Sequence, residues 1–226
     1  VVYTGNGTAI SSGGISVTGV NFQPNFVWIK SRTNAYDNML FDSVRGTLKI
    51  IKSNSAAAEI TSNTENLNSF DADGFTYGSE LSGNASGASH VSWNWKAGGT
   101  AVSNTNGSIT SSVSANPDAG FSIVTYSGTL SSAGTASVGH GLSSRPEMVI
   151  SKSRNVSGAD AGDWAVWHDY LSTDNHILRF DTAAESNKSG NGDMSSLFTT
   201  TTFGTNYTSG LNVTGNNYVA YCFHSV

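Results

Sequence analysis

The sequence contains one set of motifs twice, in the same order. The stretch Val2-Tyr3-Thr4-Gly5 matches Thr125-Tyr126-Ser127-Gly128, and the longer stretch Pro24–Arg32 matches Pro146–Arg154. Single residues after these motifs also correspond, namely Glu59 with Glu185, Phe75 with Phe203, Asn84 with Asn212, Gly87 with Gly215 and Val91 with Val219. Ordered self-similarity of this kind indicates a duplicated structural unit. We therefore predict two related domains.

The last segment of each copy alternates strictly between apolar and other side chains. Because side chains alternate across a β-strand with a period of two, residues 91–96 and 219–224 are predicted to be half-buried strands. We expect their apolar faces to lie in a core. The side chains of these faces are Val91, Trp93, Trp95, Val219, Tyr221 and Phe223.

Short strands bounded by turn residues are predicted along most of the chain, without the periodicity of long helices. The clearest are residues 26–30, 39–42, 48–51, 74–78, 121–126, 147–152, 164–168, 176–180 and 196–203. This pattern predicts an all-β protein with two tandem duplicated β-sandwich repeats of jelly-roll or lectin-like type. The first repeat is predicted to span residues 1–99 and the second 121–226. The Gly/Ser/Asn-rich stretch 100–120 between them is expected to be a linker.

The composition excludes several classes of protein. Only 12% of residues are charged, against about a quarter in most proteins, and the net charge of −5 argues against a nucleic-acid partner. No apolar run approaches the ~18 residues of a membrane span, so we expect no membrane insertion. The single cysteine, Cys222, lies among alternating aromatic residues and is expected to be a core residue. Because Val1 falls within a predicted strand and is not Met, we expect the chain to be part of a longer polypeptide.

An aromatic cluster in the second copy is the best candidate for a binding site. Trp164, Trp167, His168 and Tyr170 follow the Gly/Asp-rich insertion 157–163. Aromatic rings can stack on the apolar face of a sugar, and nearby Asp or Asn side chains can bind its hydroxyls. The same alternation also fits a core strand, and both alternatives stay open. Of the four residues, Tyr170 and Trp164 are expected to be the more exposed.

Two acidic segments resemble calcium loops only in part. Asp71-Ala72-Asp73-Gly74 begins like such a loop but lacks the later ligands, which favours a simple turn. Asp160 and Asp163 in the insertion could also supply oxygen ligands for Ca²⁺. We predict no cofactor, with calcium as the alternative.

The basic tripeptides Lys30-Ser31-Arg32 and Lys152-Ser153-Arg154 recur at equivalent positions. One interpretation is a contact for an anionic sugar or a neighbouring subunit. The other, which the duplication alone would explain, is that strands end here and the charged side chains face water.

No catalytic motif is present. The five histidines lie far apart in the sequence, and no nucleophile elbow, zinc-binding helix or phosphate-binding loop occurs. A pair of carboxylates for glycoside hydrolysis cannot be placed from sequence alone. We therefore expect a protein that is not an enzyme.

Several motifs together resemble a repeat found in virion proteins of tailed bacteriophages, especially marine ones, which are usually labelled tail, tail-fibre or lectin-like. The motifs are Tyr3–Gly7, Pro24–Arg32, Phe41–Gly46, Ser69–Phe75 and Val91–Gly99, and the segment 105–113 belongs with them. The resemblance implies a surface protein of the virion that is repeated along a long chain and oligomeric, with a trimer expected by analogy. It carries no active site to this sequence.

These observations lead to one expectation and two alternatives. We expect a non-enzymatic module of a phage tail fibre or other appendage, which displays loops for host attachment and binds surface glycans. Its other partners would be virion proteins and further copies of the chain. The first alternative is a structural spacer or capsid-decoration module, and the second is a glycan-degrading tailspike domain.

Overall fold

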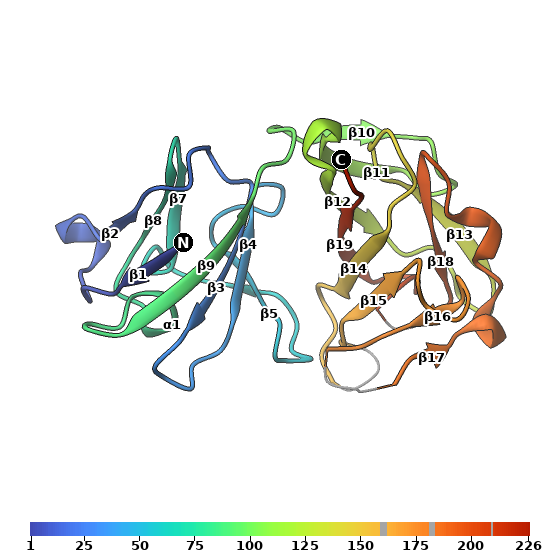
Figure 1. The fold of residues 1–226 in the computed structure, drawn as a ribbon. Helices are drawn as coiled ribbons and strands as arrows, with labels where there is room; N and C mark the ends of the chain where they lie inside the picture. The colour runs from blue at the N-terminus through green and yellow to red at the C-terminus, as the bar shows by residue number, and fades with distance from the viewer. Residues whose placement is uncertain (159–161, 181–183, 209) are drawn as a thin grey trace. The chain divides into compact units, whose positions relative to one another are not determined.

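The fold is seen in a computed structural model that describes residues 1–158, 162–180, 184–208 and 210–226. Strands account for 40% of the chain and helices for 7%, so the protein is all-β, as predicted. It separates into two compact units (Figure 1). Unit 1 is formed by Val1–Asn54 and Glu59–Lys96, and unit 2 by Ser55–Ala58 and Ala97–Val226.

Unit 1 contains two antiparallel sheets with a core between them. The larger sheet has the strand order β1 (Val2–Thr4), β9 (Ser89–Trp95), β3 (Phe26–Ser31), β4 (Met39–Asp42), β5 (Lys49–Lys52) and β6 (Ile60–Thr61). The smaller sheet has the order β2 (Ile15–Val17), β8 (Gly74–Tyr77) and β7 (Leu67–Asp71). Both sheets contribute buried side chains to one apolar cluster. Two short helices, η1 (Ile10–Ser12) and α1 (Leu81–Asn84), complete the unit.

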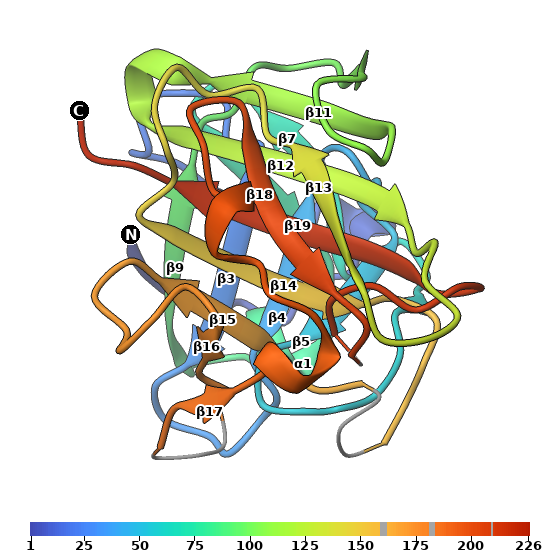
Figure 2. The ribbon, with the colours of Figure 1, turned by 90° about the vertical axis from the view of Figure 1, so that its right-hand side faces the viewer.

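Unit 2 is built around a second six-stranded antiparallel sheet (Figure 2). Its order is β10 (Val102–Asn104), β11 (Ser111–Asn116), β12 (Phe121–Ser127), β19 (Asn217–Phe223), β14 (Met148–Ser153) and β15 (Ala165–His168). Two strand pairs accompany it, β13 (Thr135–Gly139) with β18 (Thr202–Asn206) and β16 (His176–Ile177) with β17 (Ser186–Asn187). Short 3₁₀ turns are η2 (Pro117–Ala119), η3 (Ser189–Asn191) and η4 (Ser195–Leu197). The core again takes side chains from the large sheet and from β13 and β18.

The two units share part of their strand order. In unit 1 the order β1-β9-β3-β4 places the last strand between β1 and β3, and in unit 2 the order β12-β19-β14-β15 places the last strand between β12 and β14. Matching tyrosines in the first strand of each set make matching hydrogen bonds. The Tyr3 hydroxyl donates to the Gly83 carbonyl at 2.8 Å, and the Tyr126 hydroxyl donates to the Leu211 carbonyl at 2.7 Å.

Two buried asparagines form hydrogen bonds to the turns that follow these first strands. Asn84 and Asn212 are both fully buried. The Oδ1 atom of Asn84 accepts the Asn6 N–H at 2.7 Å, and that of Asn212 accepts the Thr129 N–H at 2.7 Å. Burying an amide is costly unless its polar atoms are bonded, so each asparagine holds its turn in one conformation.

The predicted orientation is wrong for β9, whereas in β19 both faces carry buried side chains. In β9 the core face carries His90 and Ser92, which are buried, because Ser92 lies opposite the core residue Ile29 of β3. Trp93, expected in the core, is 45% exposed. In β19 the core cluster takes Tyr218, Ala220 and Cys222, while Val219 and Tyr221, which were predicted to be buried, are 0% and 1% exposed. Alternation gives the period of a strand, whereas the register with its neighbours decides which face is inside.

The stretch 100–120, predicted to be a linker, contains two strands of the unit 2 sheet. All six residues of β11 pair with β12, and β10 pairs with β11. Most side chains of β11 are small and polar, so the sequence lacks the apolar alternation that marks a half-buried strand. Backbone hydrogen bonds to β12 hold this stretch in the sheet, although its side chains do not show the pattern of a strand.

A buried ion cluster crosses the end of β4 in unit 1. The Arg45 side chain is inaccessible to solvent; its Nε donates to Asp42 Oδ2 at 2.5 Å and its Nη1 to Glu59 Oε2 at 3.0 Å. Its Nη2 also donates to the Leu40 carbonyl at 3.2 Å. The guanidinium therefore joins β4 to the chain that enters β6.

Replacing Arg45 with Met should destabilise the protein by about 3–5 kcal/mol, because it leaves two carboxylates without their buried cation. Urea unfolding measures the change. The control is Asp37→Asn, which breaks an ion pair with Lys52 whose side chains are 40% and 29% exposed. That change should cost at most about 1 kcal/mol. Equal losses for the two variants would contradict a structural role for the Arg45 cluster.

Because His140 is buried, we expect the free energy of unfolding to fall in acid. His140 is fully buried, its Nδ1 accepts the Leu142 N–H at 3.0 Å, and burial lowers its pKa from 6.5 to about 4. The unfolded chain binds the proton first, so stability should fall as the pH drops from 6.5 towards 4, by about 3 kcal/mol. His140→Asn should flatten this part of a pH–stability profile. His168→Asn, at a side chain 40% exposed, is the control outside the core, and its profile should keep the step assigned to His140.

Candidate functional site

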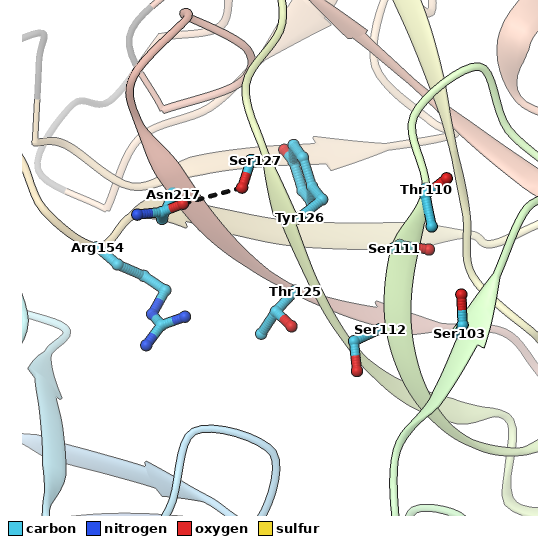
Figure 3. Close-up of a pocket in the computed structure, with 9 residues that line it drawn as sticks. All are labelled: Ser103, Thr110, Ser111, Ser112, Thr125, Tyr126, Ser127, Arg154 and Asn217. Carbon is cyan, nitrogen blue, oxygen red and sulfur yellow. Dashed lines mark hydrogen bonds between the residues drawn. The ribbon is translucent and has the colours of Figure 1, made fainter.

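A polar groove of about 370 Å³ lies on unit 2, along the strands β10, β11, β12 and β19 (Figure 3). The residues that line it are Ser103, Thr110, Ser111, Ser112, Thr125, Tyr126, Ser127, Arg154 and Asn217. Seven of these nine residues carry a hydroxyl group, one is an amide and one is a cation. The groove therefore offers many hydrogen-bonding groups and a single formal charge.

Three hydroxyl side chains form a row across the sheet. Ser103 of β10 lies opposite Ser112 of β11, and Ser112 lies opposite Thr125 of β12. Directly opposed residues of antiparallel strands project to the same face. Within the described part of the chain, none of these three hydroxyls has a hydrogen-bond partner in the protein. They are therefore available to a ligand.

The rim of the groove joins three strands. The Ser127 hydroxyl donates to Asn217 Oδ1 at 3.0 Å, and the Arg154 N–H donates to the Asn217 carbonyl at 2.7 Å. Arg154 follows β14 directly and is half-buried. Figure 3 shows its side chain on the same side of the sheet as Thr125 and Ser112. The guanidinium thus stands at one end of the hydroxyl row.

Two lining residues support the groove from the core side. The Ser111 hydroxyl donates to the Gly139 carbonyl at 2.9 Å, and the Tyr126 hydroxyl is bonded to the Leu211 carbonyl. Burial raises the pKa of Tyr126 well above its usual value, so this phenol stays neutral. These two hydroxyls fix the floor and are not free to bind a ligand.

Unit 1 has the matching arginine beside a sheet with a different edge. The Arg32 N–H donates to the Ser89 carbonyl at 2.7 Å, as Arg154 does to Asn217. However, β1 is the edge strand of the unit 1 sheet, which has no strands in the place of β10 and β11. The hydroxyl row is therefore a feature of unit 2.

The aromatic residues predicted to form one binding site lie in two different places, two in the core and two outside it. Trp164 and Trp167 are each only 3% exposed. The Trp164 ring lies 5.3 Å from the Phe180 ring, and Trp167 stacks on Phe198 at 3.8 Å between ring centroids. The expected exposure of Trp164 is wrong, because the side chain packs into unit 2 beside Lys152.

Tyr170 and His168 lie together outside the core. Tyr170 is 91% exposed, as expected, and its ring lies 5.7 Å from the His168 ring. The Tyr170 N–H donates to His168 Nδ1 at 3.2 Å. Neither residue lines the groove, so the structure separates this pair both from the two tryptophans and from the hydroxyl row.

The two basic tripeptides differ in their surroundings. Lys30 is exposed, but Lys152 is fully buried, so the expectation that these charges face water is wrong for Lys152. Its Nζ donates to the Gly162 carbonyl and lies 5.7 Å from the centre of the Trp164 ring. Burial lowers the pKa of Lys152 to about 8. This ammonium group holds the end of the insertion in place.

The predicted calcium ligands are engaged in other contacts. Asp71 accepts the hydroxyls of Ser69 and Thr76, each at 2.7 Å, while Asp73 accepts backbone N–H groups that lower its pKa. Asp163 is 9% exposed and 3.7 Å from Arg179, and Asp160 lies outside the described residues. Within those residues, no cluster of three or more His, Cys, Asp or Glu side chains could hold a metal ion.

The chain matches a known family model over its whole length. A family model described as a domain of unknown function, DUF7483, matches residues 1–226. No curated protein and no solved structure matches the chain. No helix in the described ranges is long and apolar enough to cross a membrane.

The burial of Trp164 and the exposure of Tyr170 can be tested by substitution. Trp164→Ala should lower the free energy of unfolding by about 3–5 kcal/mol, because it empties a packed position. Tyr170→Ala, the matched control, should change it by at most about 0.5 kcal/mol. Urea unfolding of both variants measures the difference, and a Trp164→Ala variant as stable as wild type would contradict the packing described.

Proposed function

The chain belongs to the DUF7483 domain family, and we propose that it is a non-enzymatic module that binds glycans at the surface of a virion. The observation that carries the binding function is the row of unbonded hydroxyls beside Arg154 in unit 2. The virion location rests on the resemblance of the repeated motifs to phage tail proteins. A glycan-binding module on a virion would serve to attach the particle to the surface of its host.

The chemistry of the groove suits a saccharide. Sugar hydroxyls both donate and accept hydrogen bonds, and so do the side chains of Ser103, Ser112 and Thr125. The volume of about 370 Å³ falls within the roughly 300–1,000 Å³ of most ligand-binding clefts. Because the row crosses three strands of one sheet, its hydroxyls are held at fixed spacings.

The lining of the groove favours binding over hydrolysis. Glycoside hydrolysis needs two carboxyl groups about 5–9 Å apart across the scissile bond. None of the nine lining residues is Asp, Glu or His. A bound glycan would therefore meet hydrogen-bonding groups but neither a general acid nor a nucleophile of the usual kind, which supports an adhesin rather than a tailspike enzyme.

The proposed architecture is a pair of tandem β-sandwich repeats of jelly-roll or lectin-like type. The shared strand order and the matching bonds of Tyr3 with Tyr126 and of Asn84 with Asn212 support a common origin. As in phage appendages, the module would assemble with copies of itself and with other virion proteins.

A structural spacer is the second candidate, and one surface of unit 1 favours it. Val2 is 59% exposed and Trp93 is 45% exposed, and Val91, half-buried, lies opposite Val2 in the pairing of β1 with β9. Successive positions 91 and 93 share a face, so these three side chains form an exposed apolar patch. Such a patch suits contact with another virion protein.

A glycan array probed with the purified chain tests the proposed function. We expect binding, and we expect the double variant Ser112→Ala/Thr125→Val to weaken it about tenfold or more, because each lost hydrogen bond costs about 0.5–1.5 kcal/mol. The control Ser132→Ala/Thr214→Val removes two exposed hydroxyls of unit 2 that lie outside the groove, and it should bind like wild type.

Two results would contradict this function. One is a folded chain that binds no glycan on the array, which would favour the spacer. The other is glycan binding that survives the groove variant but is lost in Tyr170→Ala, which would move the site to the exposed tyrosine.

A further inference from the structure

We infer that the open edge of β1 in unit 1 binds a further β-strand, in the way that β12 binds β11 in unit 2. The strand would come from an extended, uncharged segment of small polar residues with one apolar side chain on its inner face. This surface lies on unit 1, and the glycan groove of unit 2 plays no part in it.

β1 and β12 hold equivalent places in their sheets. Val2–Thr4 pairs with β9 in the register in which Thr125–Ser127 pairs with β19. The second edge of β12 is paired along six residues with β11. In contrast, β1 is the last strand of the unit 1 sheet, and no strand in the described ranges pairs with its second edge. Unit 2 therefore shows how such an edge can be covered.

The backbone of β1 is oriented for a further strand. The Val1 nitrogen donates to the Ser92 carbonyl at 2.7 Å, and the Ser92 N–H donates to the Val1 carbonyl at 2.8 Å. Backbone bonds alternate between the two sides of an antiparallel strand. The N–H and C=O groups of Val2 and Thr4 therefore face the open edge, where a further strand can bond them.

The side chains at this edge are more exposed than those of β12. Val2 is 59% exposed and Tyr3 is half-buried, whereas Tyr126 is only 5% exposed. In unit 2, Val113 of β11 belongs to the same core cluster as Tyr126. Tyr3 packs against the core of unit 1 at its open end. A further strand on β1 would place an inward side chain over this end of the core.

β1 lacks the features that keep edge strands from pairing. Natural sheets protect their edges with charged residues, proline or bulges. The residues of β1 are Val2, Tyr3 and Thr4, and their pairing with β9 shows no register shift. The exposed apolar patch of Val2, Val91 and Trp93 also ends at this edge. A further strand would shelter Val2 from water.

β11 indicates the chemistry of the segment that fits. It contains three serines, one alanine, one asparagine and Val113, and no charged residue. Ser112 lies opposite Thr125 on the outer face, while Val113 is 3% exposed in the core. Small side chains suit a strand held mainly by its backbone, and the valine supplies the inward contact. Such a segment, rather than a charged or bulky one, is the occupant that the edge of β1 favours.

The test presents this kind of segment to the full chain. A copy of residues 109–123 is placed directly before Val1, which reproduces the connection between β11 and β12 because Val1 corresponds to Val124. Attachment gives the segment a high effective concentration. The control copy carries proline at the positions that correspond to Ser112 and Ser114, so it cannot donate from them. Hydrogen exchange of the backbone amides is measured by NMR.

We expect the attached segment to slow hydrogen exchange of the Val2 and Thr4 amides about tenfold or more, because both groups become bonded. The proline copy should leave these two rates unchanged. Val2→Pro in the extended chain removes an N–H that the unit 1 sheet does not use, so the chain should fold but Thr4 should lose its protection. Ser103, on the uncharged edge strand β10 of unit 2, should exchange as before.

Three results would overturn the inference. The first is a folded, extended chain in which Val2 and Thr4 exchange at their original rates. The second is protection that falls on Ser103 of β10 instead. The third is protection already present without the attached segment that rises with protein concentration and is lost in Val2→Pro, which would make a second copy of the chain the occupant. All three leave the proposed glycan site untouched.

Discussion

The constraint on which the structure depends is the pairing of the last strand of each unit between two earlier strands. β9 pairs with β1 and β3, and β19 pairs with β12 and β14. The last strand of each unit therefore joins strands that come much earlier in the chain. The same pairing brings Ser127, Asn217 and Arg154 to one rim of the groove, although they are far apart in the sequence. The candidate site is therefore a direct product of sheet topology.

The difference between the two units is as informative as their likeness. Arg32 follows β3 in unit 1 and Arg154 follows β14 in unit 2, and the N–H of each is bonded to the start of the last strand. Only the unit 2 sheet is extended by β10 and β11, which add Ser103 and Ser112 beside Thr125. In the proposed account, the two units arose by duplication, and unit 2 alone has the binding surface because β10 and β11 extend its sheet beyond β12.

The sequence predicted the strands with strong apolar patterns well. Residues 39–42 form β4 as expected, and the strand predicted at 26–30 is β3 with one more residue. The inward face of β9 was not predictable, because alternation is symmetric and the register with β3 decides it. The repeated motifs predicted a duplication, and the two units share one part of their strand order.

The groove could not be predicted from sequence for a related reason. Ser103 and Ser112 belong to a stretch rich in small polar residues, which resembles a linker until backbone pairing aligns it with Thr125 of β12. The aromatic pattern predicted a sugar site at Trp164. Aromatic side chains also pack in hydrophobic cores, and Trp164 lies in the core. Arg154 was recognisable only as one half of a repeated basic motif. Its position beside free hydroxyls depends on tertiary structure.

The most direct test of the central claim is to map the ligand on the protein by NMR. Chemical shifts of the ¹⁵N-labelled chain would be followed during titration with the oligosaccharide that binds best on the glycan array. The account predicts that the largest changes fall on the backbone amides of Ser112, Thr125 and Asn217. Changes centred on His168 and Tyr170, or confined to unit 1, would contradict it.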